Sequence, residues 1–265
     1  SIETFWGNKK YALTLGIKSA THNHLLFTDA DCKPSSNEWI SEMIGCFSED
    51  HQIILGYGAY AKVKNSFLNK LIRFETLMTA IQYFSYCKLG QPYMGVGRNL
   101  AYTKDLFFEA RGFMDHMHIK SGDDDLFVNQ IASAKNTIIC LSKNSFTESL
   151  PKKSYSDWMV QKRRHITTAT HYKQKHKVML SLFFITQFLF LLLSIVLIGT
   201  LFYWKILLGL IALRYIAMFI SLTSAAKKLE EKDLIPFLPF LDMFLIVVQF
   251  SIFIKNTISK PTHWK

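Results

Sequence analysis

The chain has 265 residues, of which 49% are hydrophobic, and its formal net charge is +11. This length accommodates one sizeable domain with a smaller appendage. The excess of basic residues lies in residues 151–177, directly before a long apolar run, and this position favours anionic lipid headgroups or an anionic substrate over nucleic acid as a partner. The four cysteines lack the close pairing of a zinc site or a CxxC redox site, so we expect reduced thiols in a cytosolic domain.

Residues 1–150 alternate predicted helices with predicted strands. Apolar residues at helical spacing predict helices over residues 9–20, 38–47, 67–86 and 124–134. Short apolar runs predict strands over residues 24–28, 53–63, 98–102 and 137–141. This alternation predicts an α/β domain with a mainly parallel sheet and flanking helices. In such a sheet, the loops at the carboxyl ends of the strands carry the ligand site.

Two carboxylates, Asp29 and Asp31, follow the first predicted strand. Oxygen ligands at the end of a strand are suited to Mg²⁺ or Mn²⁺, which would bridge to a diphosphate. A bound cation would neutralise the charge that grows on the leaving group. The structural alternative is a polar turn with helix-capping acids.

Three consecutive acids, Asp123, Asp124 and Asp125, open the helix predicted over residues 124–134. Acids at a helix start are favoured by the helix dipole whatever their function. The functional alternative is a general base that takes the proton from an acceptor hydroxyl. Mutual repulsion would raise the pKa of at least one of the three carboxyls.

The basic segment 151–177 is predicted to form a helix along the membrane surface. Gln161, Arg164 and His165 share one helical face, and an arginine guanidinium matches phosphate oxygens. Cations beside a membrane span also anchor a protein without taking part in chemistry. That anchoring role is the favoured interpretation for Lys162 and Arg163.

Residues 178–265 form a predicted membrane domain of about three helices, over 178–202, 206–222 and 235–254. The first has about 25 uncharged residues, enough to cross a hydrocarbon core of about 30 Å. Arg214 and Asp242 interrupt the other two at similar depth, and because charges in a membrane are usually paired, we predict that they meet. The third segment contains prolines, and it either spans the membrane or re-enters on the starting side.

In this order, the segments resemble the family-2 glycosyltransferases, the group of cellulose synthase, hyaluronan synthase and ceramide glucosyltransferase. The family pattern K-x-x-A-L-x-x-G resembles residues 9–16, and its D-x-D motif resembles residues 29–31. Its Glu-Asp pair resembles residues 123–124, and its Q-x-x-R-W motif resembles residues 161–165. Residues 97–102 are similar to the segment that approaches the acceptor and the donor sugar.

The resemblance implies a nucleotide-diphospho-sugar transferase (GT-A-like) fold over residues 1–150, then the basic interfacial segment and the membrane helices. It implies an inverting transfer of sugar from a nucleotide diphosphate sugar, with a UDP-sugar favoured, to a lipid or polysaccharide acceptor. Mg²⁺ or Mn²⁺ would be the cofactor, and nucleic acid is not expected as a partner. The implied location is the cytoplasmic face of the inner cell membrane. The alternative is a catalytically inactive membrane scaffold of a polysaccharide synthase.

The resemblance also assigns a role to each candidate residue. Asp124 would be the catalytic base with Asp123 beside it, and the metal would be held by Asp29 and Asp31. The donor diphosphate would be bound by Lys9, Gln161, Arg164 and His165. The segment near the acceptor and donor sugars would contain Gly97, Arg98 and Asn99.

Three departures from the family pattern bear on these roles. Asp123 stands where glutamate is usual, and with three consecutive acids the base could shift to Asp125. His165 replaces the usual tryptophan, so ring stacking against the substrate is in question. The family's first strand, which holds an acid that recognises the nucleotide base, has no counterpart before Ser1, and we therefore expect an N-terminally truncated fragment.

Overall fold

A computed structural model describes residues 9–119 and 121–259. The first part contains α2 (Lys9–Ser19), β1 (His24–Phe27), β2 (Cys32–Pro34), α3 (Trp39–Ile44), β3 (Ile53–Leu55), β4 (Gly58–Tyr60), α4 (Phe67–Lys88), β5 (Leu100–Thr103) and α5 (Lys104–Glu109). The second contains α6 (Asp125–Ile131), β6 (Thr137–Ile139), β7 (Thr147–Ser149), α7 (Tyr155–Ala169), α8 (Gln174–Gly199), α9 (Trp204–Lys228) and α10 (Leu238–Ile258). The short 3₁₀ turns are η1 (Met114–His116), η2 (Lys143–Ser145) and η3 (Lys232–Phe237).

The larger sheet has four strands in the order β1-β5-β3-β6. β5 lies between β1 and β3 and is antiparallel to both, whereas β3 and β6 are parallel. The prediction of a mainly parallel sheet was therefore wrong. The apolar pattern of a strand shows which residues face the core, but it does not show the direction in which the strand runs. Strand β5 starts at the edge of the sheet where β1 and β3 end, so it runs antiparallel to both.

The direction of β5 has a consequence for the site. β1, β3 and β6 all point the same way, and the start of β5 lies opposite the ends of β1 and β3, with Leu100 paired to Phe27 and Leu55. The residues after β1 and before β5 therefore meet at one edge of the sheet. This is the edge at which the α/β rule places a ligand.

The strand predicted over residues 53–63 is two strands in different sheets. β3 belongs to the larger sheet, whereas β4 joins a second sheet in the order β2-β7-β4. The break falls at Gly56, where an added Cβ would lie 2.5 Å from the side chain of Asn99. This close approach requires glycine, and it separates the two strands.

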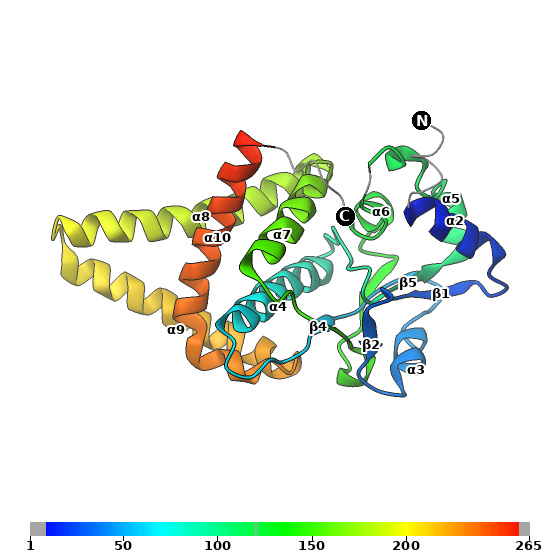
Figure 1. Ribbon diagram of the computed structural model, residues 1–265, viewed down its shortest axis with the longest axis horizontal. Helices are drawn as coiled ribbons and strands as arrows, with labels where there is room; N and C mark the ends of the chain where they lie inside the picture. The colour runs from blue at the N-terminus through cyan, green and yellow to red at the C-terminus, as the bar shows by residue number, and fades with distance from the viewer. Residues whose placement is uncertain (1–8, 120, 260–265) are drawn as a thin grey trace.

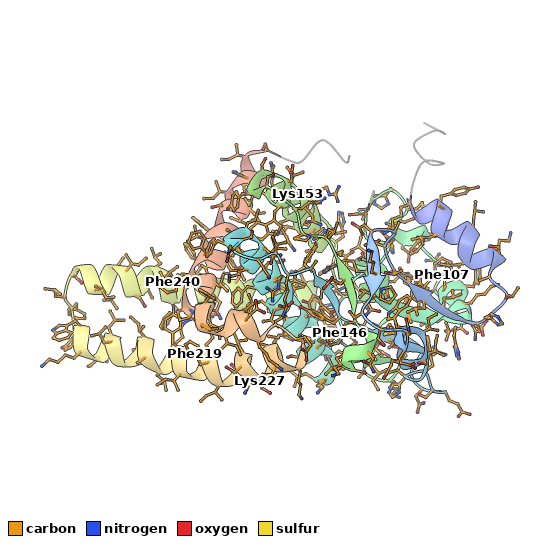
Figure 2. All side chains as sticks on the ribbon, turned by 60° about the horizontal axis from the view of Figure 1, so that its bottom comes forward. Phe107, Phe146, Lys153, Phe219, Lys227 and Phe240 are labelled. Carbon is orange, nitrogen blue, oxygen red and sulfur yellow. The ribbon has the colours of Figure 1, made fainter. Side chains whose placement is uncertain are left out.

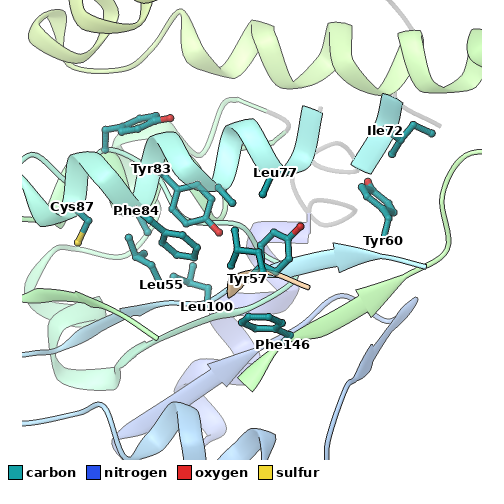
Figure 3. Packing of buried hydrophobic residues seen from close by; sticks show 14 of the residues in the cluster. Leu55, Tyr57, Tyr60, Ile72, Leu77, Tyr83, Phe84, Cys87, Leu100 and Phe146 are labelled. Atoms are coloured by element: carbon teal, nitrogen blue, oxygen red, sulfur yellow. The ribbon is translucent and has the colours of Figure 1, made fainter. Parts of the chain in front are cut away.

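Helix α4 carries the core of the α/β part. In Figure 3, Leu77, Tyr83 and Phe84 of α4 face Leu55 and Leu100 of the larger sheet. The same buried cluster continues without a break into the C-terminal helices, through Leu222, Ala226, Leu234, Leu238, Leu241, Leu245, Val248 and Ile252. The end of α9, the turn η3 and helix α10 are therefore packed on the α/β part.

Among the described residues, three helices are long and apolar enough to cross a membrane: Gln174–Gly199, Trp204–Lys228 and Lys232–Ile258. In Figure 1, α8 and α9 form an arm that projects from the rest of the molecule. Figure 2 shows the side chains of this arm directed outward along both helices, and most of its apolar residues are exposed. The predicted third segment begins within the 3₁₀ turn η3, which contains Pro236, and Pro239 lies in the first turn of α10, where proline is tolerated.

Arg214 of α9 and Asp242 of α10 are in contact, with 2.8 Å between Nη2 and Oδ2. The argument from depth and charge predicted this contact. Arg214 also donates a hydrogen bond to Gln187 of α8, and its guanidinium lies 4.8 Å from the centre of the Phe190 ring. One cation therefore joins all three apolar helices.

The variant Arg214→Leu is expected to destabilise the protein by about 3–5 kcal/mol, because it leaves the buried Asp242 carboxylate without its partner. The double variant R214L/D242L removes both charges and should unfold at a higher temperature than the single variant. Thermal unfolding of the detergent-solubilised protein measures both. If each single variant unfolded at the wild-type temperature, the pair would have no part in stability.

Candidate active site

A cavity of about 1150 Å³ lies at the edge of the sheet where β1 and β3 end. Its walls come from the start of α2, the turn after β1, the loop before β5, the start of α6, and helices α4, α7 and α10. The predicted site residues that line it are Lys9, Asp29, Asp31, Gly97, Arg98, Asp123, Asp124, Gln161, Arg164 and His165. Segments far apart in the sequence thus contribute to one hollow.

Asp29 and Asp31 lie in a tight turn between β1 and β2, closed by a hydrogen bond from the Cys32 N–H to the Asp29 carbonyl at 3.0 Å. Ligand atoms of Asp29, Asp31 and Cys32 lie within 4.8 Å of one another. Both carboxylates retain access to solvent in the cavity. Two accessible carboxylates this close fit a hard divalent cation such as Mg²⁺ or Mn²⁺.

Lys9 connects the two acid groups. Its Nζ lies 3.0 Å from Asp29 Oδ1 and 2.8 Å from Asp123 Oδ2. Burial alone would lower the pKa of Lys9, but the charges and hydrogen bonds of Asp123 and Asp29 outweigh burial and raise that pKa. The ammonium therefore stays charged and balances carboxylates on both sides of the cavity.

Lys10, the next residue, points the other way. It is fully buried, and its Nζ hydrogen-bonds to the carbonyls of His116 and Ile119 at 2.7 Å and 3.0 Å and to His116 Nδ1 at 2.8 Å. Burial lowers the pKa of Lys10 to about 8. Of the two lysines at the start of α2, Lys9 thus lines the cavity, and Lys10 holds the segment around His116 and Ile119 that precedes the three acids. Sequence analysis did not single out Lys10.

The three consecutive acids have three different environments. Asp123 pairs with Lys9, whereas Asp124 caps α6 and accepts the Gly97 N–H at 2.6 Å and the Asp125 N–H at 2.8 Å. Asp125 is buried and accepts the hydroxyl of Tyr172 at 2.7 Å. The close approach to Asp124 explains Gly97, since an added Cβ would lie 3.1 Å from Asp124 Oδ2.

These environments raise the pKa values of Asp124 and Asp125 by different amounts. Burial, then the charge of Asp123, raises the pKa of Asp124 to about 6. Burial, then the charge of Asp124, raises the pKa of Asp125 to about 8. Both pKa values are therefore raised, that of Asp125 more than that of Asp124, so Asp124 gives up its proton first and is the better suited of the two to act as a base.

Asp125→Asn is expected to raise the unfolding temperature, by an amount that grows as pH rises from about 4 to 8. In the folded state, the pKa of Asp125 is about 8, against 3.8 for the free group. The folded wild type therefore binds more protons than the unfolded chain in this window, and its stability falls as pH rises. Thermal unfolding across this pH range tests the effect, with the exposed-site variant Asp50→Asn as control. A constant difference between D125N and wild type would contradict the raised pKa.

Helix α7 presents its predicted face to the cavity. Gln161, Arg164 and His165 all line it, and Gln161 Nε2 lies 3.4 Å from the Tyr60 hydroxyl. Membrane anchoring was the favoured interpretation for Lys162 and Arg163, and that role stays a prediction. Lys162 forms an ion pair with Glu75 of α4, and Arg163 hydrogen-bonds to α10.

Arg98 and Asn99 differ in position. Arg98 lines the cavity, donates to the Ala59 carbonyl at 2.9 Å and lies over the Tyr60 ring at 4.3 Å. Asn99 is fully buried and does not line the cavity. Its amide donates to the carbonyls of Tyr57 and Ser145 at 3.0 Å and 2.7 Å. These backbone groups engage the Asn99 side chain, so Asn99 supports the loop before β5, and its predicted position near the sugars stays a prediction.

Several cavity residues were not found from the sequence. Among them are Tyr57, Tyr60, Glu75, Lys152, Tyr172, Leu245 and Val248. Each lies in a strand, helix or loop whose local pattern is explained by core packing or by the basic segment alone. Only the folded arrangement brings them to the cavity.

No protein-family model and no curated protein matches the chain by sequence. Solved structures do match the chain. One is the mannosyltransferase PcManGT from Pyrobaculum calidifontis, determined in complex with GDP-Man and Mn²⁺. The match covers 95% of this chain and 67% of that one, with a TM-score of 0.50 and 14% sequence identity. At this identity, the likeness establishes the fold.

Proposed function

We propose that this protein is a membrane-bound, inverting glycosyltransferase of family-2 type that transfers a sugar from a nucleotide diphosphate sugar to a lipid or glycan acceptor. The observation that carries the proposal is the convergence of Asp29, Asp31, Asp124 and Arg164 on one cavity. Two carboxylates suited to a metal, a separate carboxylate suited to a base and a cation suited to phosphate are the parts that this reaction needs.

The nucleotide diphosphate sugar would be bound both by a metal ion and by polar and cationic side chains of the cavity. Asp29 and Asp31 would hold Mg²⁺ or Mn²⁺, which when bound neutralises charge on the diphosphate as it leaves. Arg164 and Gln161 on α7 also line the cavity, and they would bind phosphate oxygens by hydrogen bonds. Lys9 would add a second cationic side chain from its position beside Asp29.

Asp124 would act as the base in a single displacement. The acceptor oxygen attacks the anomeric carbon and gives its proton to Asp124, while the bond from that carbon to the diphosphate oxygen breaks. Attack from the face opposite the leaving group inverts the anomeric centre. The Gly97 and Asp125 amides hold the Asp124 side chain in place, so the carboxylate is oriented before the acceptor binds.

The apolar helices would keep the site at a membrane, with the α/β part on the cytoplasmic side. The basic residues of the segment 151–177 support this orientation, since cytoplasmic segments next to membrane helices are rich in lysine and arginine. The solved mannosyltransferase was bound to GDP-Man, so GDP-mannose belongs beside UDP-sugars among the donors to test.

The deciding experiment incubates membranes containing the full chain with radiolabelled UDP- and GDP-sugars, in Mg²⁺, in Mn²⁺ and in chelator. We expect label to move from one donor into a lipid or polymer fraction in the presence of metal. Membranes with the Asp124→Asn variant serve as the matched control. If neither transfer nor donor hydrolysis occurred with any donor, an inactive scaffold would replace the proposal.

A further inference from the structure

Helix α10 differs from the other two apolar helices in its packing. Within its most apolar 18-residue window, 39% is buried inside the protein, against 6% for α8 and 11% for α9. In Figure 1, α10 runs beside α7 and crosses the arm formed by α8 and α9. It contacts α4, α7 and α8 along its length. Length and composition permit it to span a membrane, so its neighbours must decide where it lies.

The start of α10 is held to the α/β part by a buried ion cluster. Arg73 of α4 donates to Glu231 at 2.9 Å and to Asp233 at 2.8 Å, and both Arg73 and Glu231 are almost inaccessible to solvent. Lys62 pairs with Asp233 at 3.0 Å, and the Tyr57 hydroxyl donates to Glu231 at 3.2 Å. Since Tyr57 also lines the cavity, the turn before α10 lies on the side of the active site.

The end of α10 is held to the same part of the protein. Arg163 Nε of α7 donates to Asn256 Oδ1 at 2.8 Å, and Arg163 Nη2 donates to Ser259 Oγ at 3.1 Å. The Asn256 amide returns a bond to the Arg163 carbonyl at 3.4 Å. Helix α7 also carries Gln161 and Arg164 of the cavity wall. Both ends of α10 are thus bonded to elements that line the active site.

Between these ends, α10 has two different faces. Its inward residues recur every three or four positions and are buried: Leu238, Leu241, Leu245, Val248 and Ile252. The last three of them, with Gln249, form part of the cavity wall. Its outward face is apolar and exposed, with Phe240, Phe244, Val247, Phe253 and Ile254. One face of α10 is thus covered by protein, and the apolar face opposite is open to contact lipid.

We propose that α10 does not cross the membrane but lies along its surface on the side of the active site, with its outer face in lipid and its inner face walling the cavity. The arm of α8 and α9 is then the part that enters the bilayer. A crossing α10 would have to carry either the Arg73 cluster or the Arg163 contacts to the far side, away from the helices that supply them. The proposal rests on the membrane association that is part of the proposed function.

Two further observations agree with this placement. Lys255 comes to lie on the same side as the basic segment 151–177, as the positive-inside tendency requires, whereas a third crossing would place it opposite. The ion pair of Arg214 and Asp242 lies where α10 meets α9. A surface position for α10 brings this pair toward the headgroup region, where charge is less costly than in the hydrocarbon core.

The test is to label single cysteines in sealed vesicles with a membrane-impermeant maleimide, in a background with all four native cysteines replaced by alanine. The variants are Glu148→Cys in the α/β part, Glu230→Cys before α10, Ser259→Cys after it and Val247→Cys on its outer face. All four positions are exposed in the structure. We expect positions 148, 230 and 259 to label from the same side, and position 247 to label only after detergent is added.

Labelling of position 259 from the side opposite to position 230 would show that α10 crosses, and it would overturn the proposal without affecting the assigned reaction. Ready labelling of position 247 in intact vesicles would place the outer face in water and would also overturn it. Release of the protein from membranes by alkaline carbonate would remove membrane association, and with it both this proposal and that part of the proposed function. If the cysteine-free background does not fold, an epitope tag at the C-terminus of the unaltered chain replaces the labelling. Digestion of the tag by protease, in sealed vesicles of either orientation, shows on which side of the membrane α10 ends.

Discussion

Asparagine in place of Asp124 is expected to reduce sugar transfer about 10²- to 10⁴-fold, the usual contribution of a general base. Asparagine matches the shape of aspartate, and its carbonyl oxygen can still accept one of the two N–H bonds that now hold Asp124. What the variant loses is the ability to take the acceptor's proton. Donor affinity should change little, because the predicted metal and diphosphate contacts come from other residues. Steady-state transfer rates together with calorimetric donor titration measure the two quantities.

Asp125→Asn is the matched control for this substitution, since it makes the same chemical change one residue away. Its side chain is buried against the Tyr172 hydroxyl, and burial raises its pKa further than that of Asp124. We expect D125N to retain transfer within a few fold of wild type. If D125N lost activity while D124N kept it, the base would be Asp125 and the assignment made here would be wrong.

Loss of the predicted metal ligand should have the second large effect. Asp31→Asn is expected to reduce metal-dependent transfer by about 100-fold or more, because a bound divalent cation contributes several kcal/mol of charge stabilisation. Chelator should reduce the transfer rate of the wild type to a similar level. Excess Mn²⁺ should restore the transfer rate of the wild type to a greater extent than that of the variant. Manganese titration followed by electron paramagnetic resonance gives a readout of binding that does not depend on activity.

The control for this series is Asp50→Asn, an exposed acid outside the cavity. It should bind Mn²⁺ and transfer sugar as the wild type does. Equal Mn²⁺ affinity in D31N and D50N would remove Asp31 from the metal site. Full activity of the wild type in chelator would remove the metal from the reaction.

Local patterns in the sequence placed most of the helices and strands correctly, together with the apolar helices. Helix α2, strand β1 and helix α4 were predicted within a few residues of their observed bounds. Such elements are encoded locally, since the period of the apolar residues distinguishes a helix from a strand. The short strands β2 and β7 were missed because three residues carry too little periodicity to detect.

The sequence predicted most of the residues that meet at the cavity but not the contacts that they make there. Acids after a strand end, acids at a helix start and a cation on one helical face are visible in the sequence, and all of them line the cavity. The sequence left the base open among three consecutive acids. In the structure each acid has its own partner: Lys9 for Asp123, the Gly97 amide for Asp124 and Tyr172 for Asp125. The sequence does not show these pairings, because the partners lie far from the acids along the chain.

The sequence by itself determined which segments are helical, which are apolar enough for a membrane, and which charged residues need a partner there. Only the tertiary structure decided the reversed direction of β5, the burial of Asn99 and the packing of α10 on α4 and α7. The physical reason is the range of the interactions. Periodicity and capping act over a few neighbouring residues, whereas strand direction, a buried amide's partners and a helix's choice between lipid and protein depend on groups that folding brings from elsewhere in the chain.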